Sequence, residues 1–183
     1  MRTTLVMLVR HAEKPTGSGG PFGVTAHGLP DEESLTIRGW ARAGALAALF
    51  APVDGKVRAG LEVPRALFAS DAHRKKGSRR PAQTIAELAD RLGLTVDTSC
   101  QKGDVARLVA AVRTAEVSLI SWQHEEIPAI VAGLGTVHPP APATWPEDRY
   151  DVVWVLRSTD GSNWEFSQVP QQLLAGDGAE PIG

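Results

Sequence analysis

The feature that most constrains the fold of this chain is a short apolar run near its start, Leu5–Val9, which ends at Arg10 and His11. An uninterrupted apolar run of this length is typical of a parallel strand that is buried on both faces of a sheet. Ligands of open α/β sheets bind just beyond the carboxyl ends of such strands. The sequence therefore predicts a strand over Thr3–Val9 that delivers a guanidinium and an imidazole together to a ligand-binding edge.

Segments with strand and helix patterns alternate along the rest of the chain. Further strands are predicted over residues 65–69, 94–96 and 116–122, and a closing hairpin is predicted over 151–169. Helices are predicted over about 36–50, with Thr36 as the N-cap, over 81–92, with Gly93 as the stop, and over 105–112 and 128–134. Strands that alternate with helices predict an α/β fold of three layers, α/β/α, around a mostly parallel central sheet. The proline-rich stretch 137–146 is predicted to be a loop.

Length and composition define the class of protein. A chain of 183 residues fits one domain over 1–183, with a core over about 3–169 and a loosely held C-terminal tail. A net charge of −2 gives no bulk attraction to nucleic acid or to an anionic membrane. Cys100, the single cysteine, cannot form an internal disulfide, and the first apolar run is too short for a signal peptide or membrane span. We therefore expect a cytoplasmic protein.

Basic side chains are predicted to meet at the carboxyl edge of the sheet. Arg10 and His11 follow the first strand, Arg80 opens the helix after the second, and His124 follows the strand that ends near Trp122. Two guanidiniums can each bind two oxygens of a phosphoryl group, and each charge-assisted hydrogen bond contributes roughly 1.5–3 kcal/mol. A neutral imidazole can also attack phosphorus, which matters because uncatalysed phosphomonoester hydrolysis is among the slowest reactions known.

Four motifs follow one another along the chain: Arg-His-Ala-Glu-Lys at 10–14, Leu-Thr-x-x-Gly-x-x-x-Ala at 35–43, Ser-Arg-Arg-Pro-Ala-Gln-Thr at 78–84, and His124-Glu125. Together they resemble the histidine phosphatase superfamily, also called the phosphoglycerate mutase-like family. The resemblance implies a phosphoglycerate mutase-like fold and hydrolysis of phosphomonoesters without a metal or another cofactor. It implies that His11 is the nucleophile, which forms a phosphohistidine intermediate. The residues that would hold the phosphate are Arg10, Arg80 and His124.

The proton donor to the leaving oxygen is less well defined by the motifs. We predict Glu125 as the general acid, with Asp104 and Glu13 as alternatives. Glu125 could instead complement a helix dipole, and Asp104 could cap a helix. Residues expected to contact the substrate around the phosphate are Glu13, Lys14, Ser78, Arg79 and Asp104. The basic run 74–76 is either a further anion contact or a solvated loop.

Other functions on the same scaffold stay open. A mutase-type phosphotransferase normally needs added segments that keep water from the phosphoenzyme, so a compact chain favours a phosphatase. The substrate is either a small phosphate ester or a phosphoprotein that carries phosphohistidine. A phospho-ligand-binding module without catalysis is the alternative of another class. Specificity is expected to lie in the loops 15–30, 71–79 and 136–149, and the Gly/Pro-rich first loop is the candidate lid.

Overall fold

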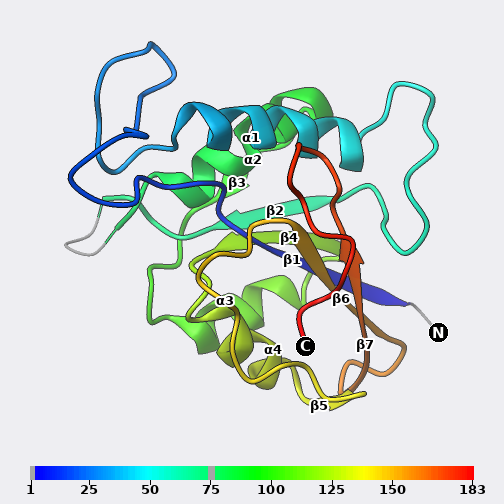
Figure 1. The fold of residues 1–183 in the computed structure, drawn as a ribbon. Coiled ribbons are helices and arrows are strands. Elements are labelled where there is room, and N and C mark those ends of the chain that lie inside the picture. Colours follow the sequence, from blue (N-terminus) through cyan, green and yellow to red (C-terminus); the bar gives the residue numbers. More distant parts are fainter. Residues whose placement is uncertain (1–2, 74–76) are drawn as a thin grey trace.

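The computed structural model describes residues 3–73 and 77–183, so the predicted basic contact at 74–76 lies outside the described residues. Within these residues a seven-stranded sheet is covered by two helices on each face (Figure 1). The strands are β1 (Thr4–Arg10), β2 (Ala66–Ala69), β3 (Val96–Asp97), β4 (Val117–Trp122), β5 (Thr136–His138), β6 (Val152–Ser158) and β7 (Asn163–Pro170). This is the predicted three-layer α/β/α architecture.

The sheet is mostly parallel, as predicted. Its strand order is β3-β2-β4-β1-β6-β7-β5, and the strands from β3 to β1 run parallel. Strand β6 is antiparallel to both of its neighbours, and β5 is parallel to β7. Ala69, Ser121 and Val9 lie in register across β2, β4 and β1, so these three strands end at one edge. The segments that follow them, which begin at Ser70, Gln123 and His11, therefore emerge side by side.

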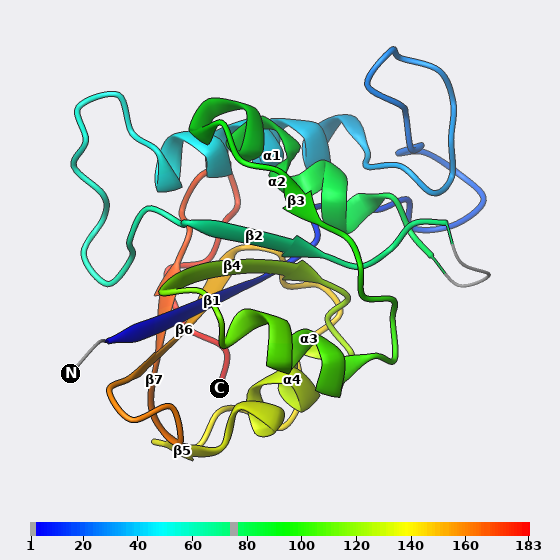
Figure 2. The same cartoon turned by 180° about the vertical axis from the view of Figure 1, so that it is seen from behind.

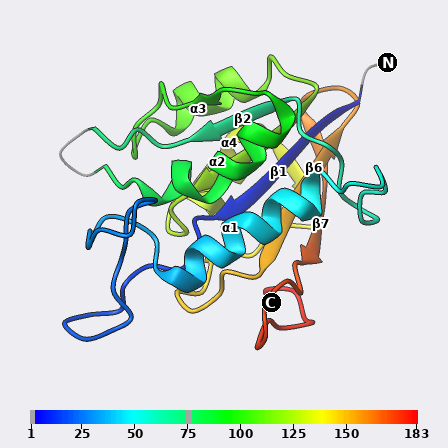
Figure 3. The same cartoon turned by 90° about the horizontal axis from the view of Figure 1, so that it is seen from above.

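The helices lie in pairs on the two faces of the sheet. They are α1 (Ile37–Phe50), α2 (Arg80–Leu92), α3 (Val105–Val112) and α4 (Ile127–Leu134). Helices α1 and α2 pack side by side on one face, and α3 and α4 pack on the other (Figures 2 and 3). Thr36 caps α1 by accepting the Gly39 N–H at 3.1 Å, and Gly93, at φ 65°, ends α2 in the left-handed region. Both helix signals were read from the sequence.

Strand β1 connects the two halves of the core. Its side chains alternate between the faces: Val6 and Leu8 pack on the α3/α4 side, while Leu5, Met7 and Val9 pack on the α1/α2 side. All of its residues from Leu5 onward are buried. Burial on both faces explains why the run is uninterrupted by polar residues. It also makes the strand a rigid support for the residues at its end.

Two segments differ from the sequence predictions. The stretch expected to be only a loop contains strand β5, which pairs with β7. The C-terminal residues, expected to be loosely held, pack against the domain: Ile182 is buried in the α3/α4 core and exchanges two hydrogen bonds with the Gln168 side chain, at 2.7 and 2.9 Å. Among the described residues, no helix has the length and hydropathy of a membrane span.

Candidate active site

A cavity of about 180 Å³ lies at the carboxyl edge of β1, β2 and β4. Its walls come from the segments that follow these strands and from the start of α2. The lining residues are His11, Lys14, Glu33, Ser78, Arg80, Lys102, Gln123, His124 and Glu125. Both histidines and one of the two arginines expected to converge therefore share one cavity. Its positive side chains, Lys14, Arg80 and Lys102, outnumber its two carboxylates, so the cavity is suited to an anion.

The His11 imidazole is buried and held in one orientation. Its Nδ1 lies 2.8 Å from the Ala12 carbonyl oxygen, which can only accept a hydrogen bond. Nδ1 therefore carries the proton, and Nε2 keeps its lone pair. The pKa of His11 is lowered to about 3, mainly by burial and also by the positive charges of Arg10 and Arg80, against the opposing effect of the Ala12 hydrogen bond. The ring is thus neutral at physiological pH, and its Nε2 lone pair is free for chemistry.

Thr84, on the first turns of α2, connects the His11–Ala12 segment to Arg80. Its hydroxyl accepts the Ala12 N–H at 2.8 Å and donates to the Arg80 carbonyl at 2.7 Å. The side chain is completely buried. Sequence reasoning quoted Thr84 as the last residue of the 78–84 motif but assigned it no role. The structure shows that it fixes the end of β1 against the start of α2.

Arg80 is the first residue of α2 and faces the cavity. Its Nη2 donates to the Glu32 carbonyl at 2.6 Å and lies 3.6 Å from the Glu33 carboxylate. Its Nε is buried and has no hydrogen-bond partner within the described residues. An unsatisfied buried donor costs about 1–3 kcal/mol, and more for a charged group. An anion in the cavity would remove that cost.

Arg10 is not among the residues that line the cavity, although its charge acts on both histidines there. The side chain is fully buried, and its Nη1 donates to the carbonyls of Glu147 and of Arg149, the latter at 3.3 Å. Its Nη2 donates to the Tyr150 hydroxyl at 3.1 Å, and the guanidinium carbon lies 3.9 Å from that ring's centroid. Burial lowers the pKa of Arg10, and its Nε is unpartnered within residues 3–73 and 77–183. Arg10 therefore ties the strand end to the 146–150 segment and keeps one donor unused.

His124 and Gln123 follow β4 into the same cavity. Burial, and then the charge of Arg10, lower the pKa of His124. Its Nδ1 lies 3.1 Å from a Glu125 carboxylate oxygen but makes no hydrogen bond within the described part of the chain. Gln123 donates to the Ser70 hydroxyl at 2.9 Å, which leaves its own amide oxygen unpartnered among those residues. Gln123 had no predicted role, because a glutamine beside a histidine carries no distinctive sequence signal.

The candidate proton donors lie in different surroundings. Glu125 lines the cavity and pairs with Lys102; although partial burial raises its pKa, this hydrogen bond holds the pKa below its usual value. Glu13 lies outside the cavity wall, where its carboxylate accepts from Arg42 Nε at 3.0 Å and Nη2 at 2.8 Å. Asp104 precedes α3, also outside the wall, and accepts a long hydrogen bond from the Gln101 N–H at 3.4 Å.

The residues predicted to contact the substrate also divide into those that line the cavity and those that lie outside it. Lys14 and Ser78 line the cavity, together with Glu33 and Lys102, which sequence reasoning did not assign. Arg79 points away and pairs with Asp31 at 3.1 Å. Glu33 and Lys102 belong to loops between motifs, so only the folded chain brings them to the site. Among the described residues, no group of three or more His, Cys, Asp or Glu side chains could hold a metal ion.

Comparison with known proteins gives no sequence match but a clear structural one. No protein-family model matches the chain, and no curated protein matches it. Among solved structures, a protein described as mycobacterial hydrolase 1 aligns with a TM-score of 0.56 and 15% identity, covering 91% of this chain and 97% of that one. A mycobacterial glucosyl-3-phosphoglycerate phosphatase aligns with a TM-score of 0.53 and 17% identity, covering 92% and 98%.

A third structure, assigned as the phosphohistidine phosphatase SixA of Agrobacterium tumefaciens, aligns with a TM-score of 0.51 and 17% identity, covering 84% of this chain and 90% of that one. The two named phosphatases have the fold of the histidine phosphatase superfamily. This chain has that fold, the phosphoglycerate mutase-like one, over nearly its whole length.

Proposed function

We propose that this protein is a phosphatase that hydrolyses phosphomonoesters through a phosphohistidine intermediate on His11. The observation that carries the proposal is a cluster of unused polar atoms. Six buried side-chain polar atoms lack a hydrogen-bond partner among the described residues, and three of them, Nε of Arg10, Nε of Arg80 and Nδ1 of His124, are nitrogens that can donate to an anion. Buried polar groups are normally satisfied, so such a cluster around a neutral imidazole marks the place of an absent anionic ligand.

The reaction would proceed in two steps. His11 Nε2 attacks phosphorus, so a P–N bond forms while the bond to the leaving oxygen breaks, and the released alkoxide takes a proton. Water then attacks the phosphohistidine, the P–N bond breaks, and inorganic phosphate leaves. Arg10 Nε, Arg80 Nε and the His124 ring would donate to the phosphoryl oxygens as charge develops on them. These groups supply the stabilisation that a metal provides in other phosphatases, so the proposed reaction needs none.

Glu125 is the proposed proton donor. In the free protein Lys102 favours its carboxylate form. A phosphate dianion beside Glu125 would oppose this effect, because a nearby like charge raises the pKa of a carboxyl group. The acid form would then protonate the leaving oxygen in the first step, and the resulting carboxylate could accept a proton from the attacking water in the second.

A small phosphate ester is the favoured substrate over a phosphoprotein. Lys14, just before the 15–33 loop, and Glu33, at its end, line the proposed phosphate cavity, so this loop borders the site and would narrow access for a folded partner. A mutase would need the phosphoenzyme to be shielded from water, and among the described residues the 15–33 loop is the candidate cover. Cys100 is buried and has no second cysteine to pair with, which fits a reducing compartment, so the cytoplasm is the proposed location.

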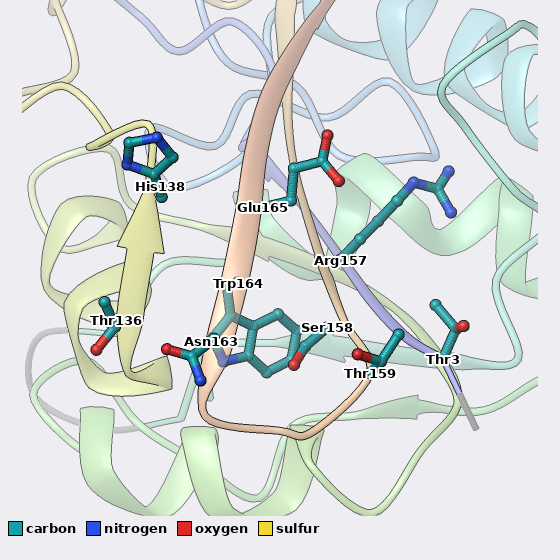
Figure 4. A pocket seen from close by; sticks show the side chains of 9 residues that line it. All are labelled: Thr3, Thr136, His138, Arg157, Ser158, Thr159, Asn163, Trp164 and Glu165. Atoms are coloured by element: carbon teal, nitrogen blue, oxygen red, sulfur yellow. The ribbon is translucent and has the colours of Figure 1, made fainter. Parts of the chain in front are cut away.

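The activity is tested by hydrolysis of phenyl phosphate in buffer that contains a metal chelator. We expect release of phosphate by the wild-type protein and loss of at least 10⁴-fold in kcat for His11→Ala, because the covalent route disappears (about 5 kcal/mol or more in barrier). The matched control is His138→Ala. His138 lies on β5 beside a separate cavity at the other end of β1, where Thr3 and Ser158 also lie (Figure 4), and its loss should leave kcat unchanged.

Three results would contradict the proposal. Tight phosphate binding without turnover would identify a binding module instead. Turnover that persists in His11→Ala would exclude His11 as the nucleophile. Hydrolysis confined to a phosphohistidine protein, with none of phenyl phosphate, would move the assignment to a phosphoprotein phosphatase.

A further inference from the structure

We propose that the 15–33 loop forms a subsite for the alcohol part of the substrate, and that this subsite selects a leaving group with an apolar body and a cationic group over one with a carboxylate. The selection rests on the proposed phosphatase activity of the adjoining site. The chemistry of the cavity walls indicates the substrate class: phosphate monoesters of amino-substituted aromatic or alkyl alcohols.

The subsite is a second, larger cavity of about 860 Å³ that adjoins the phosphate cavity. Arg80 and Glu33 line both cavities, so the two meet at these side chains. A phosphate held against His11 and Arg80 would therefore direct its ester oxygen and alcohol part toward the larger space. The volume is within the range of ordinary small-molecule sites.

Part of the wall of this cavity is apolar. Its apolar residues include Pro15, Phe22, Val24 and Pro30. The Phe22 side chain is 65% exposed, an unusual state for a large aromatic residue that covers no core. A ring or alkyl chain bound in the cavity would contact Phe22 and remove its surface from water.

The loop is anchored, so the cavity exists before any ligand binds. Val24 pairs through its N–H with the Leu35 carbonyl at 2.9 Å, and its own carbonyl accepts the Trp40 indole N–H at 2.8 Å. Gly23 packs so closely that a Cβ at this position would lie 2.2 Å from the Asp31 carbonyl oxygen. Val24 is therefore held both to Leu35, just before α1, and to Trp40 on α1. Preorganisation of this kind lowers the cost of binding.

The charge of the subsite is opposite to that of the phosphate cavity. Its acidic lining residues are Asp31, Glu32 and Glu33, and its only cationic lining residue among those described is Arg80. Asp31 is already paired with Arg79 and with the Ser34 hydroxyl. Glu32 and Glu33 are exposed, and Glu33 is also paired with Arg80 at 3.6 Å. A carboxylate on the alcohol part would be repelled here, whereas an ammonium would be attracted.

The test compares three aryl phosphates of nearly equal size: phenyl phosphate, 4-(aminomethyl)phenyl phosphate and 4-carboxyphenyl phosphate. We expect kcat/KM for the amine to exceed that for the carboxylate at least tenfold at pH 7.5 and low salt. The double variant Glu32→Gln/Glu33→Gln should reduce this ratio to below about threefold. Because both rates come from the same variant, a general loss of activity cancels in the ratio.

Two further variants complete the design. Glu87→Gln removes one negative charge from the exposed side of α2, where Glu87 pairs with Arg91. This variant should leave the amine-to-carboxylate ratio of kcat/KM unchanged. Phe22→Ala should raise KM for all three esters while leaving the amine-to-carboxylate ratio in place, since the aromatic wall does not sense charge.

The outcomes separate this inference from the proposed function. Hydrolysis of phenyl phosphate that requires His11, but with a ratio near one or in favour of the carboxylate, would overturn the subsite alone. A tenfold ratio that survives in the double variant would also overturn it, because the selection would then come from elsewhere. No turnover of any of the three esters would overturn both.

Discussion

Three buried or nearly buried arginines, Arg10, Arg42 and Arg80, lie close to the end of β1. The hydrogen-bond partners of Arg42 differ completely from those of the other two. Every nitrogen of the Arg42 guanidinium is used: it binds Glu13, Asp177 and the Gln171 amide oxygen, with distances of 2.7 to 3.1 Å. Burial lowers the pKa of Arg42, but these partners outweigh it and raise the pKa well above the ordinary value. Arg10 and Arg80 instead keep Nε unpartnered among the described residues, and burial lowers the pKa of Arg10.

The contrast separates a structural cation from a ligand-binding one. A buried arginine that is saturated by carboxylates joins parts of the chain, here the 10–14 motif, α1 and the C-terminal segment. A buried arginine with an unused donor has been placed for a group that the protein itself does not supply. Residue type and burial alone do not distinguish these cases, because Arg42 is as buried as Arg10.

The largest expected effect is on stability, from Arg42→Met. Removing this cation leaves Glu13 and Asp177 with Arg38, a half-exposed arginine at 3.3 and 3.7 Å, as their remaining cationic partner, which costs about 3 kcal/mol. Urea unfolding followed by circular dichroism measures the free energy of unfolding. A loss below 1 kcal/mol would show that the network is not structural. The residual activity of the folded fraction should remain near that of the wild type.

Arg80→Met should have the opposite effect to Arg42→Met, with a large loss of activity and little change in stability. We expect kcat/KM for phenyl phosphate to fall by about 10²–10³, because one preorganised donor to the phosphoryl oxygens is lost. The free energy of unfolding should change little or rise, since an unsatisfied buried donor disappears with the side chain. Steady-state kinetics and urea unfolding on the same preparation provide both values. Equal damage to stability in Arg80→Met and Arg42→Met would remove the distinction between the two kinds of arginine.

The third effect is a pH dependence of stability that belongs to Asp177. The hydrogen bond and charge of Arg42, with two backbone N–H groups, outweigh burial and lower the pKa of Asp177 to about 2, from an ordinary value of 3.8. A depressed carboxyl pKa stabilises the fold fully above about pH 4, and this stabilisation of about 2 kcal/mol is lost as the pH falls toward 2. In Asp177→Asn the pH dependence between 4 and 2 should flatten. An unchanged slope would show that other carboxylates cause the pH dependence of stability.

The smallest effect concerns the proton donor. Glu125→Gln should slow the hydrolysis of an alkyl phosphate about tenfold more than that of 4-nitrophenyl phosphate, whose leaving group needs little protonation. The ratio of kcat values for the two substrates is the measurement, and Glu126→Gln, one residue further on, is the matched comparison. Equal slowing of both substrates by Glu125→Gln would exclude it as the acid.

The sequence predicted the elements that depend on local pattern. The apolar run of β1, the Thr36 cap and the Gly93 helix end are encoded by neighbouring residues, and so is the delivery of His11 to a strand end. Strand β5 was missed because it is only three residues long and is followed by two prolines, so its pattern is that of a loop. It exists because β7 offers an unpaired edge.

Roles that depend on distant partners were not predictable. Glu13 belongs to a motif that indicates catalysis, yet its carboxylate binds Arg42, 29 residues away. The C-terminal segment contains few apolar residues, so nothing local indicated that Asp177 and Ile182 would be buried against the domain. Glu33 has no motif around it and reaches the phosphate cavity only because the 15–33 loop folds back onto α2.

The central claim is tested most directly by trapping the intermediate. The protein is mixed with a ³²P-labelled aryl phosphate, quenched in alkali within milliseconds, digested and analysed by mass spectrometry. The account predicts a phosphoryl group on the peptide that contains His11, stable in alkali, lost in acid and absent from His11→Ala. A label on any other residue, or full turnover without labelled protein at any time, would contradict it.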